Sequence, residues 1–452
     1  MKDKELVYKR KWNMKLYSLH KALSADFLFY YAVKFLFLNE VKGLTTAEIL
    51  IGTAVYGLCV ALFQIPSTVV LDRLGDKKGI IIGDFFIGIG SIVFIFSNNL
   101  LIYLISRVLV AFGIAMKELG ESAVLNKSIP TTEKKNKIFA AIDGKGLGGY
   151  YYISALTAGI SGFLYTINPY IPMILCSLVT FIAFRVAFMF EEIEVKETKK
   201  EKEEKKENLI ERYRDSIREN RLAFKFIFTS SRLKALMLYS GLMFSMLQVM
   251  MTYELGHLSE IKLSASVIGV TYAIMQIISG FSARRQYIVH NLFRNKTLTV
   301  LGIIFTVSIM FTGIFSLTTL PYGVIVAVVM ICYTLRSIVS GTYYVLIKKY
   351  LANFTNTRML KRVYASYGVV TGISNIVICL IAAMIVTYNS ISYSMIIFGL
   401  ISTVAMMAVL YYMSDKVGLR PEEYNKKDIS MSEYAKINGR GERIWIKLKK
   451  WK

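Results

Sequence analysis

The chain has 452 residues, of which 54% are hydrophobic and only 19% are charged. Soluble proteins of this size usually carry about a quarter charged residues, so the composition argues against a soluble protein. Apolar stretches recur from end to end, each long enough to cross a bilayer core of about 30 Å as a helix. These features predict an all-α polytopic membrane protein.

The formal net charge of +24 is compatible with a nucleic-acid partner. The cations, however, stand at predicted helix ends and in loops, as the positive-inside rule for membrane proteins expects. We therefore exclude nucleic acid and expect the basic surface to face anionic lipid head groups. The four cysteines all lie in apolar stretches and the chain has three histidines, so neither a metal nor a cofactor is expected.

In chain order, a basic arm over residues 1–16 leads into a predicted six-helix bundle over residues 17–190. Alternating Glu and Lys over residues 191–232 indicate a solvated linker. A second bundle over residues 233–413 follows, and a basic tail over residues 414–452 ends the chain. The twelve predicted membrane helices cover residues 17–38, 45–71, 79–97, 100–122, 138–165, 170–190, 233–255, 265–283, 297–317, 321–345, 362–387 and 391–413.

Loop charges set the expected orientation. An inner N-terminus leaves Lys42 and Lys262 as the only cations of the outer loops, whereas every inner loop carries several. We therefore expect a multi-pass protein of the cell (inner) membrane with both termini in the cytoplasm. Six plus six helices around a central inner loop is also typical of transporters that bind their solute at the midplane between two repeats.

The turn between the second and third predicted helices carries the most specific motif of the chain. Residues 64–78 read QIPSTVVLDRLGDKK. This stretch resembles the cytoplasmic loop signature of the major facilitator superfamily, in which an Asp-Arg-x-Gly core is followed by basic residues. The matching positions are Pro66, Asp72, Arg73, Gly75, Lys77 and Lys78.

Further stretches extend the resemblance over nearly the whole chain outside the arm, linker and tail. Residues 107–113 resemble the helix-four signature of this family, with its membrane-embedded Arg. Residues 120–125 resemble the segment that ends this helix in drug-efflux-like bacterial members. The resemblance implies twelve helices in two six-helix bundles, alternating access, and solute movement coupled to an ion gradient.

The resemblance also implies a cytoplasmic gate. In the family, an Asp at the position of Asp72 and nearby Arg residues hold this gate shut, partly against the N-terminal end of helix eleven. The gate residues implied for this chain are Asp72, Arg73, Gly75, Lys77 and Lys78, facing Arg358 and Arg362.

Charged residues inside the first and fourth predicted helices are candidates for binding and coupling. An intramembrane carboxylate is functional by default, so Asp26 is expected to bind a coupling proton or a cationic solute, with a structural ion pair as the alternative. Lys34 lies about 12 Å further along an unbroken helix and is expected to snorkel to the outer interface, unless it binds an anion or a carboxylate. Arg107 should lie at a depth similar to that of Asp26, and we hypothesise that these two residues form a coupling pair.

Lower in the first bundle, Lys117 and Glu121 are spaced for a local ion pair on one helix, close to Glu118. In the fifth helix, the spacing of Gly144 and Gly148 indicates close helix packing rather than a phosphate-binding loop.

The second bundle adds Glu254, which ends the seventh helix with His257 just outside. Glu254 is either a second coupling carboxylate or a solvated outer end. Arg336 is intramembrane and should face the cavity or a carboxylate, and Gln248 is a candidate solute contact. The seventh helix is also rich in methionine, which indicates core packing, with a surface for apolar ligands as the alternative. These methionines are Met237, Met243, Met246, Met250 and Met251.

The Asp-Arg-x-Gly loop and the few strongly polar groups in the helices favour proton-coupled export of amphipathic organic compounds, with cations as one option. No ATP-binding motif is visible, so a gradient of H⁺ or Na⁺ is expected to supply the energy. The alternative is an ion-coupled uptake permease for a small metabolite, which a polar constellation of Asp26, Lys34, Arg107 and Arg336 would favour. A non-transporting sensor is a further alternative, an enzyme is not expected because no nucleophile–base set is present, and a monomer is expected.

Overall fold

The computed structural model describes residues 2–130, 135–193, 224–293, 296–353 and 360–414, together with positions 214, 218 and 221. Helices and turns make up these residues, and no β-strand occurs among them. Ten of the described helices are long and apolar enough to cross a membrane. Two more segments, a broken first helix and the helix 135–167, complete the twelve predicted crossings, so the protein is an all-α integral membrane protein.

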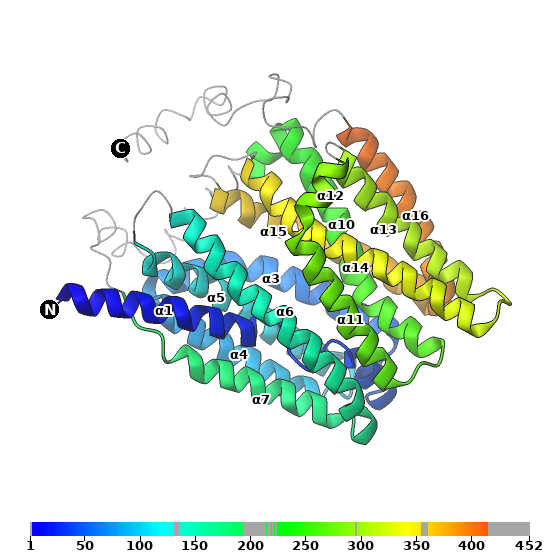
Figure 1. The fold of residues 1–452 in the computed structure, drawn as a ribbon, viewed down its shortest axis with the longest axis horizontal. Coiled ribbons are helices and arrows are strands. Elements are labelled where there is room, and N and C mark those ends of the chain that lie inside the picture. The colour runs from blue at the N-terminus through cyan, green and yellow to red at the C-terminus, as the bar shows by residue number, and fades with distance from the viewer. Residues whose placement is uncertain are drawn as a thin grey trace.

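Two bundles of helices lie side by side (Figure 1). The N-terminal bundle contains α1 (Lys2–Ser24), α2 (Lys34–Leu36), η1 (Phe37–Val41), α3 (Thr46–Leu74), α4 (Asp76–Ile95), α5 (Leu100–Ser128), α6 (Lys135–Ile167) and α7 (Tyr170–Ala187). The C-terminal bundle contains α10 (Ser231–Glu260), α11 (Ala265–Arg284), α12 (Gln286–Phe293), α13 (Thr297–Ser316), α14 (Tyr322–Asn353), α15 (Leu360–Thr387) and α16 (Ile391–Met413).

Polar side chains cap the membrane helices. The α3 N-terminus has a complete capping box, in which Glu48 N–H donates to Thr45 Oγ1 at 3.2 Å and Thr45 N–H donates to Glu48 Oε2 at 2.8 Å. Asn99 caps α5 and Ser264 caps α11 by accepting from the backbone three residues on. The sequence thus marks several helix starts by residue type.

The turn between α3 and α4 requires a glycine. Gly75 has φ +92°, a conformation that side-chain-bearing residues rarely adopt, and α3 reaches Leu74 rather than ending at residue 71 as predicted. Asp76 begins α4, where the helix dipole favours a carboxylate, and it pairs with Lys127 of α5 at 2.5 Å. This turn therefore ties three helices together at one end of the bundle.

The first predicted helix, residues 17–38, is not continuous. It begins earlier, at Lys2, ends at Ser24, and resumes as helix only at Lys34. Asp26 accepts from the backbone N–H of Phe27 at 2.8 Å, which competes with helical hydrogen bonding. Phe29 has φ +61°, a strained value for a non-glycine residue that costs about 1–3 kcal/mol. Irregular backbone at membrane depth is tolerated where it lines a cavity.

Close glycine contacts differ from those predicted on α6. A side chain added at Gly144 or Gly148 would meet nothing within 4 Å, so these residues do not mediate close packing. Gly146 and Gly149 face α1 instead, where an added Cβ would lie 3.0 Å from Lys21 and from Ala22, respectively. The prediction of close helix packing from the four-residue spacing of Gly144 and Gly148 is therefore wrong.

The two bundles meet mainly where α3 packs on α15 and where α6 packs on α11 (Figure 1). At the second contact the backbones touch. A Cβ on Gly162 would lie 2.5 Å from the Ala265 carbonyl oxygen and 3.0 Å from Gly269 Cα. Gly162 therefore sets how closely the bundles approach each other.

Replacing Gly162 by Val is expected to lower the thermal unfolding midpoint in detergent, because overpacking costs typically about 1–3 kcal/mol. The matched control is Gly148→Ala on the same helix, where the added methyl group meets open space and raises helix propensity. Equal midpoints for the two variants would contradict the close contact.

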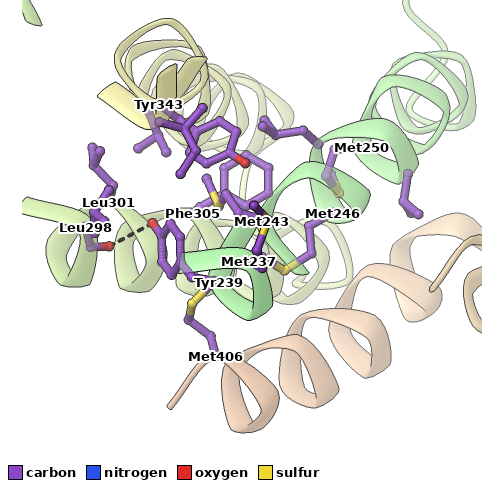
Figure 2. Packing of buried hydrophobic residues seen from close by; sticks show 14 of the residues in the cluster. Met237, Tyr239, Met243, Met246, Met250, Leu298, Leu301, Phe305, Tyr343 and Met406 are labelled. Carbon is purple, nitrogen blue, oxygen red and sulfur yellow. Dashed lines mark hydrogen bonds between the residues drawn. The ribbon is translucent and has the colours of Figure 1, made fainter. Parts of the chain in front are cut away.

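Methionine and aromatic side chains fill the core of the C-terminal bundle. Figure 2 shows four methionines of α10 packed among Tyr239, Phe305 and Tyr343. The Tyr239 hydroxyl donates to the Leu298 carbonyl at 2.8 Å, which satisfies its polar end in this apolar surrounding. The core-packing prediction is confirmed for Met237, Met243, Met246 and Met250.

Some predicted features lie outside the described residues. These are the centre of the linker at residues 194–213, Arg358, and residues 415–452 of the tail. The side chains of Asp72 and Arg362 are likewise not described, whereas Arg73 and Lys78 are exposed and Lys77 is half-buried beside the turn at Gly75. The gate assignment therefore stays a prediction.

Candidate functional site

A small cavity lies between the bundles. The broken segment between α1 and α2, together with α3, α5 and α10, supplies its walls. Its lining residues are Asp26, Phe27, Tyr30, Tyr31, Lys34, Thr53, Tyr56, Arg107, Val110, Gln248, Met251 and Thr252. Four of the six residues predicted to bind or couple share this one cavity.

Asp26 is held by neighbours of its own segment. Its Oδ1 accepts from the Phe27 backbone N–H at 2.8 Å, and its Oδ2 accepts from the Tyr31 hydroxyl at 2.7 Å. The hypothesised ion pair between Asp26 and Arg107 is not formed. The reason is local, because the broken helix turns the carboxylate toward its own backbone and toward Tyr31.

Arg107 is a buried cation surrounded by aromatic rings. Its guanidinium carbon lies 5.6 Å from the Tyr30 ring centroid, 5.2 Å from Phe94 and 5.4 Å from Tyr103. Each such cation–π contact contributes about 0.5–2 kcal/mol, which offsets part of the desolvation cost. Its Nη2 donates to Ser106 Oγ at 3.4 Å, and its Nε has no hydrogen-bond partner among the described residues. The cavity therefore contains a guanidinium with unused hydrogen-bonding capacity.

Lys34 does not snorkel to the outer interface as expected. It lies at the start of α2, its Nζ stands 5.7 Å from the Tyr30 ring centroid, and it lines the cavity. The break in the helix is the cause, since it brings Lys34 onto the cavity that also holds Asp26. Within the described part of the chain, no carboxylate lies within ion-pair distance of Lys34 or Arg107.

The cavity thus has a definite charge pattern. Two cations, Lys34 and Arg107, face one carboxylate, Asp26. Hydroxyl and amide groups of the other lining residues surround them, and Gln248 and Met251 extend the wall from the C-terminal bundle. This arrangement can accept an anionic group and has one acceptor for a cationic group.

Glu254 and Arg336 are placed elsewhere, inside the C-terminal bundle. Arg336 Nε donates to Glu254 Oε1 at 2.5 Å, while Nη1 donates to the Ser308 carbonyl and to Thr312 Oγ1. Arg336 thus faces a carboxylate, one of the two predicted placements, and Glu254 is not a solvated helix end. His257 is also fully buried rather than outside. Neither Glu254 nor Arg336 lines the cavity.

The Glu254–Arg336 pair is expected to be a structural element. Glu254→Leu should destabilise the protein by about 3–5 kcal/mol, because it leaves a buried guanidinium unpaired, and Glu254→Leu/Arg336→Met should recover much of that loss. The measurement is thermal unfolding in detergent. Asp76→Asn, which breaks the half-exposed pair with Lys127, is the control and should cost about 0–1 kcal/mol. A double variant less stable than the single one would argue against this assignment.

A second buried polar group was missed by sequence reasoning. His20 of α1 contacts Asp84 of α4 at 2.7 Å and Glu121 of α5 at 2.8 Å. Glu121 was expected to pair with Lys117, but Lys117 Nζ donates to the Ser24 carbonyl instead. One signal was available, because Asp84 is a carboxylate in the middle of an apolar stretch.

Comparisons with known proteins agree with this architecture. The family model described as Major Facilitator Superfamily matches residues 22–335. No curated protein matches the sequence of this chain.

Solved structures with the same fold include three kinds of transporter. A mutant of the nucleoside transporter NupG has a TM-score of 0.65 at 12% identity, covering 89% of this chain and 99% of that one. A D-xylose-proton symporter has a TM-score of 0.63 at 12% identity, covering 90% and 97%. A mutant of the peptide transporter POT has a TM-score of 0.62 at 14% identity, covering 92% and 95%. At these identities the likeness shows the fold alone.

Proposed function

Because this chain belongs to the Major Facilitator Superfamily, we propose that it is a proton-coupled permease for a small organic acid or zwitterion. It is a transporter rather than an enzyme, and it works by alternating access between its two bundles. The single observation that carries the proposed solute is the pair of cavity cations, Lys34 and Arg107, without a carboxylate partner among the described residues.

The charge pattern argues against a cationic solute, which was one option from the sequence. A solute cation would stand near the Arg107 guanidinium in a site of low dielectric, where like charges repel strongly. A solute carboxylate would instead pair with Arg107, whose planar guanidinium suits bidentate recognition of carboxylates. Asp26 would then contact the ammonium group of a zwitterion.

Several wider features belong to the same proposal. The loop charges support a cytoplasmic-membrane location with both termini inside. The exposed Arg73 and Lys78 beside the Gly75 turn support a cytoplasmic gate there, which Asp72 and Arg362 would complete. Neighbouring structures of a proton symporter and of transporters for peptides and nucleosides support a polar small solute and a proton gradient. We propose that the monomer is the working unit.

Export of amphipathic compounds is the second candidate. Met251 and the rings of Tyr30, Tyr31 and Tyr56 give the cavity wall large apolar surfaces, which tolerate varied ligands. The two candidates differ in the sign of the solute charge and in direction.

The test uses purified protein in vesicles that contain a pH-sensitive dye. A pH gradient is imposed, and amino acids, dipeptides, dicarboxylates and lipophilic cations are added in turn. The proposal expects proton movement into the vesicles with carboxylate-bearing solutes and none with lipophilic cations. Proton movement with the cations alone would overturn it in favour of export.

A further inference from the structure

The buried triad of His20, Asp84 and Glu121 lies outside the cavity. Imidazole Nε2 is 2.7 Å from Asp84 Oδ2, and Nδ1 is 2.8 Å from Glu121 Oε1. The three residues are 0%, 2% and 2% exposed, respectively. They come from α1, α4 and α5, so the packing of three helices builds this triad.

The triad geometry fixes its proton count. Each of the two nitrogen–oxygen contacts needs one hydrogen, but a neutral imidazole has one N–H and ionised carboxylates have none. The triad therefore holds either an imidazolium between two carboxylates or a neutral imidazole with one protonated carboxyl group. The two forms contain the same number of protons and carry the same net charge. Removal of one proton leaves a contact between two acceptors, which is repulsive.

The other buried histidine of the described chain shows that burial alone does not create this property. His257 is equally buried, but its nitrogens contact the Tyr333 and Ser316 hydroxyls at 2.8 Å and 2.7 Å. A hydroxyl can donate or accept, so both contacts are compatible with a neutral ring. His20 differs because the short contact of each ring nitrogen is to a carboxyl group, with the Ser24 hydroxyl a longer third contact at 3.3 Å from Nδ1.

Charged groups around the triad connect it to the end of α1. Lys117 of α5 donates from Nζ to the carbonyl of Ser24, the last residue of α1, and Ser24 Oγ lies 3.3 Å from His20 Nδ1. Lys117 stands four residues before Glu121, so both lie on one face of α5. The cavity residue Asp26 follows Ser24 by two positions.

The other charged groups packed against α1 make no described hydrogen bond or ion pair with the three residues of the triad. Asp143 of α6 accepts from Lys21 Nζ at 2.5 Å and from the Tyr17 hydroxyl at 2.6 Å, and Glu118 of α5 acts electrostatically on Lys21. Beyond α7, the Phe190 ring meets His20 edge-on at 5.6 Å between centroids.

We infer that the His20–Asp84–Glu121 triad binds the coupling proton and positions the end of α1, from which the broken segment with Asp26 continues. This inference rests on the proposed function. When the proton leaves, the triad gains a negative charge, which draws Lys117 toward Glu121 and away from the Ser24 carbonyl. The broken segment then loses an anchor on the side where the cavity begins. Ring nitrogens that donate cannot ligate Na⁺, which takes oxygen ligands, so the triad selects H⁺.

The test compares wild type, Glu121→Gln and the matched control His257→Gln in vesicles. The Gln amide can satisfy His20 without a titrating carboxylate, so it imitates the proton-loaded triad. We expect Glu121→Gln to lose accumulation driven by a pH gradient at least tenfold while solute counterflow, which needs no net proton transfer, stays within about twofold. His257→Gln should keep both activities. Wild-type accumulation by Glu121→Gln would overturn the inference.

Two further outcomes, an unstable variant and a wild type that moves no tested solute, also lead to a test of the triad. If Glu121→Gln is not monodisperse, Asp84→Asn makes the same test at the other ring nitrogen. If wild type moves none of the tested solutes, the proposed function fails, and the triad is tested by proton release from detergent-solubilised protein on a step from low to high pH. Wild type should then release one proton more than Glu121→Gln, and equal release would overturn the inference.

Discussion

Arg107→Gln is expected to abolish measurable transport of carboxylate-bearing solutes. The guanidinium is buried, lines the cavity and has no carboxylate partner among the described residues, so the solute would be its counterion. Truncating one partner of a buried, hydrogen-bonded charge pair costs about 2–5 kcal/mol, which corresponds to roughly a 30-fold to several-thousand-fold loss of affinity. The measurement is the concentration dependence of solute counterflow.

Two comparison variants make this result specific. Arg107→Lys keeps the charge but loses the planar fork, and an intermediate loss is expected. Lys42→Gln removes another cation that lies over aromatic rings, 5.3 Å from Phe37 and 5.0 Å from Tyr170, but outside the cavity. It should transport like wild type. Equal losses in Arg107→Gln and Lys42→Gln would contradict a binding role for Arg107.

Asp26→Asn is expected to shift the affinities of two solute classes in opposite directions. A zwitterion loses the partner of its ammonium group and should bind at least tenfold more weakly. An anion without an amino group loses a repulsive neighbour in a low-dielectric site and should bind more tightly. Affinities from competition in the counterflow assay measure both effects.

The matched control for this variant is Asp143→Asn on α6. Asp143 is also held by a tyrosine and lies in the same bundle, but it is not among the cavity residues. For Asp143→Asn, the affinities of zwitterions and of anions without an amino group are not expected to shift in opposite directions. A uniform loss of proton-driven accumulation in Asp26→Asn, for every solute, would instead identify Asp26 as the coupling group that the sequence suggested.

The sequence was sufficient to predict the membrane fold because long apolar stretches and loop charges record it directly. Helix starts were also readable where a polar cap stands, as at Thr45 and Asn99. The break after Ser24 was not predictable in this way. No glycine or proline marks residues 24–34, and the break depends on hydrogen bonds from Asp26 and on tertiary packing.

That single break explains most of the errors in the candidate site. On a continuous helix, Lys34 lies about 12 Å from Asp26 and was expected at the outer interface, whereas the broken segment places both on one cavity. The membership of Asp26, Arg107 and Gln248 in the cavity could be proposed because intramembrane polar residues are costly. The contacts of His20 with Asp84 and Glu121 could not be proposed in this way. They join α1, α4 and α5, and they depend on the rotation of each helix about its axis, which one sequence does not reveal.

The most direct test of the cation-lined cavity measures binding without any gradient. Purified protein is heated with amino acids, dipeptides and dicarboxylates, each compared with the amide of the same compound. A ligand that binds only the folded state raises the unfolding midpoint, and at a given concentration a tighter ligand raises it more. We expect at least one carboxylate to stabilise wild type, its amide to have no effect, and Arg107→Gln to show no difference between them. Stabilisation by the amide equal to that by the carboxylate would contradict recognition of an anionic group.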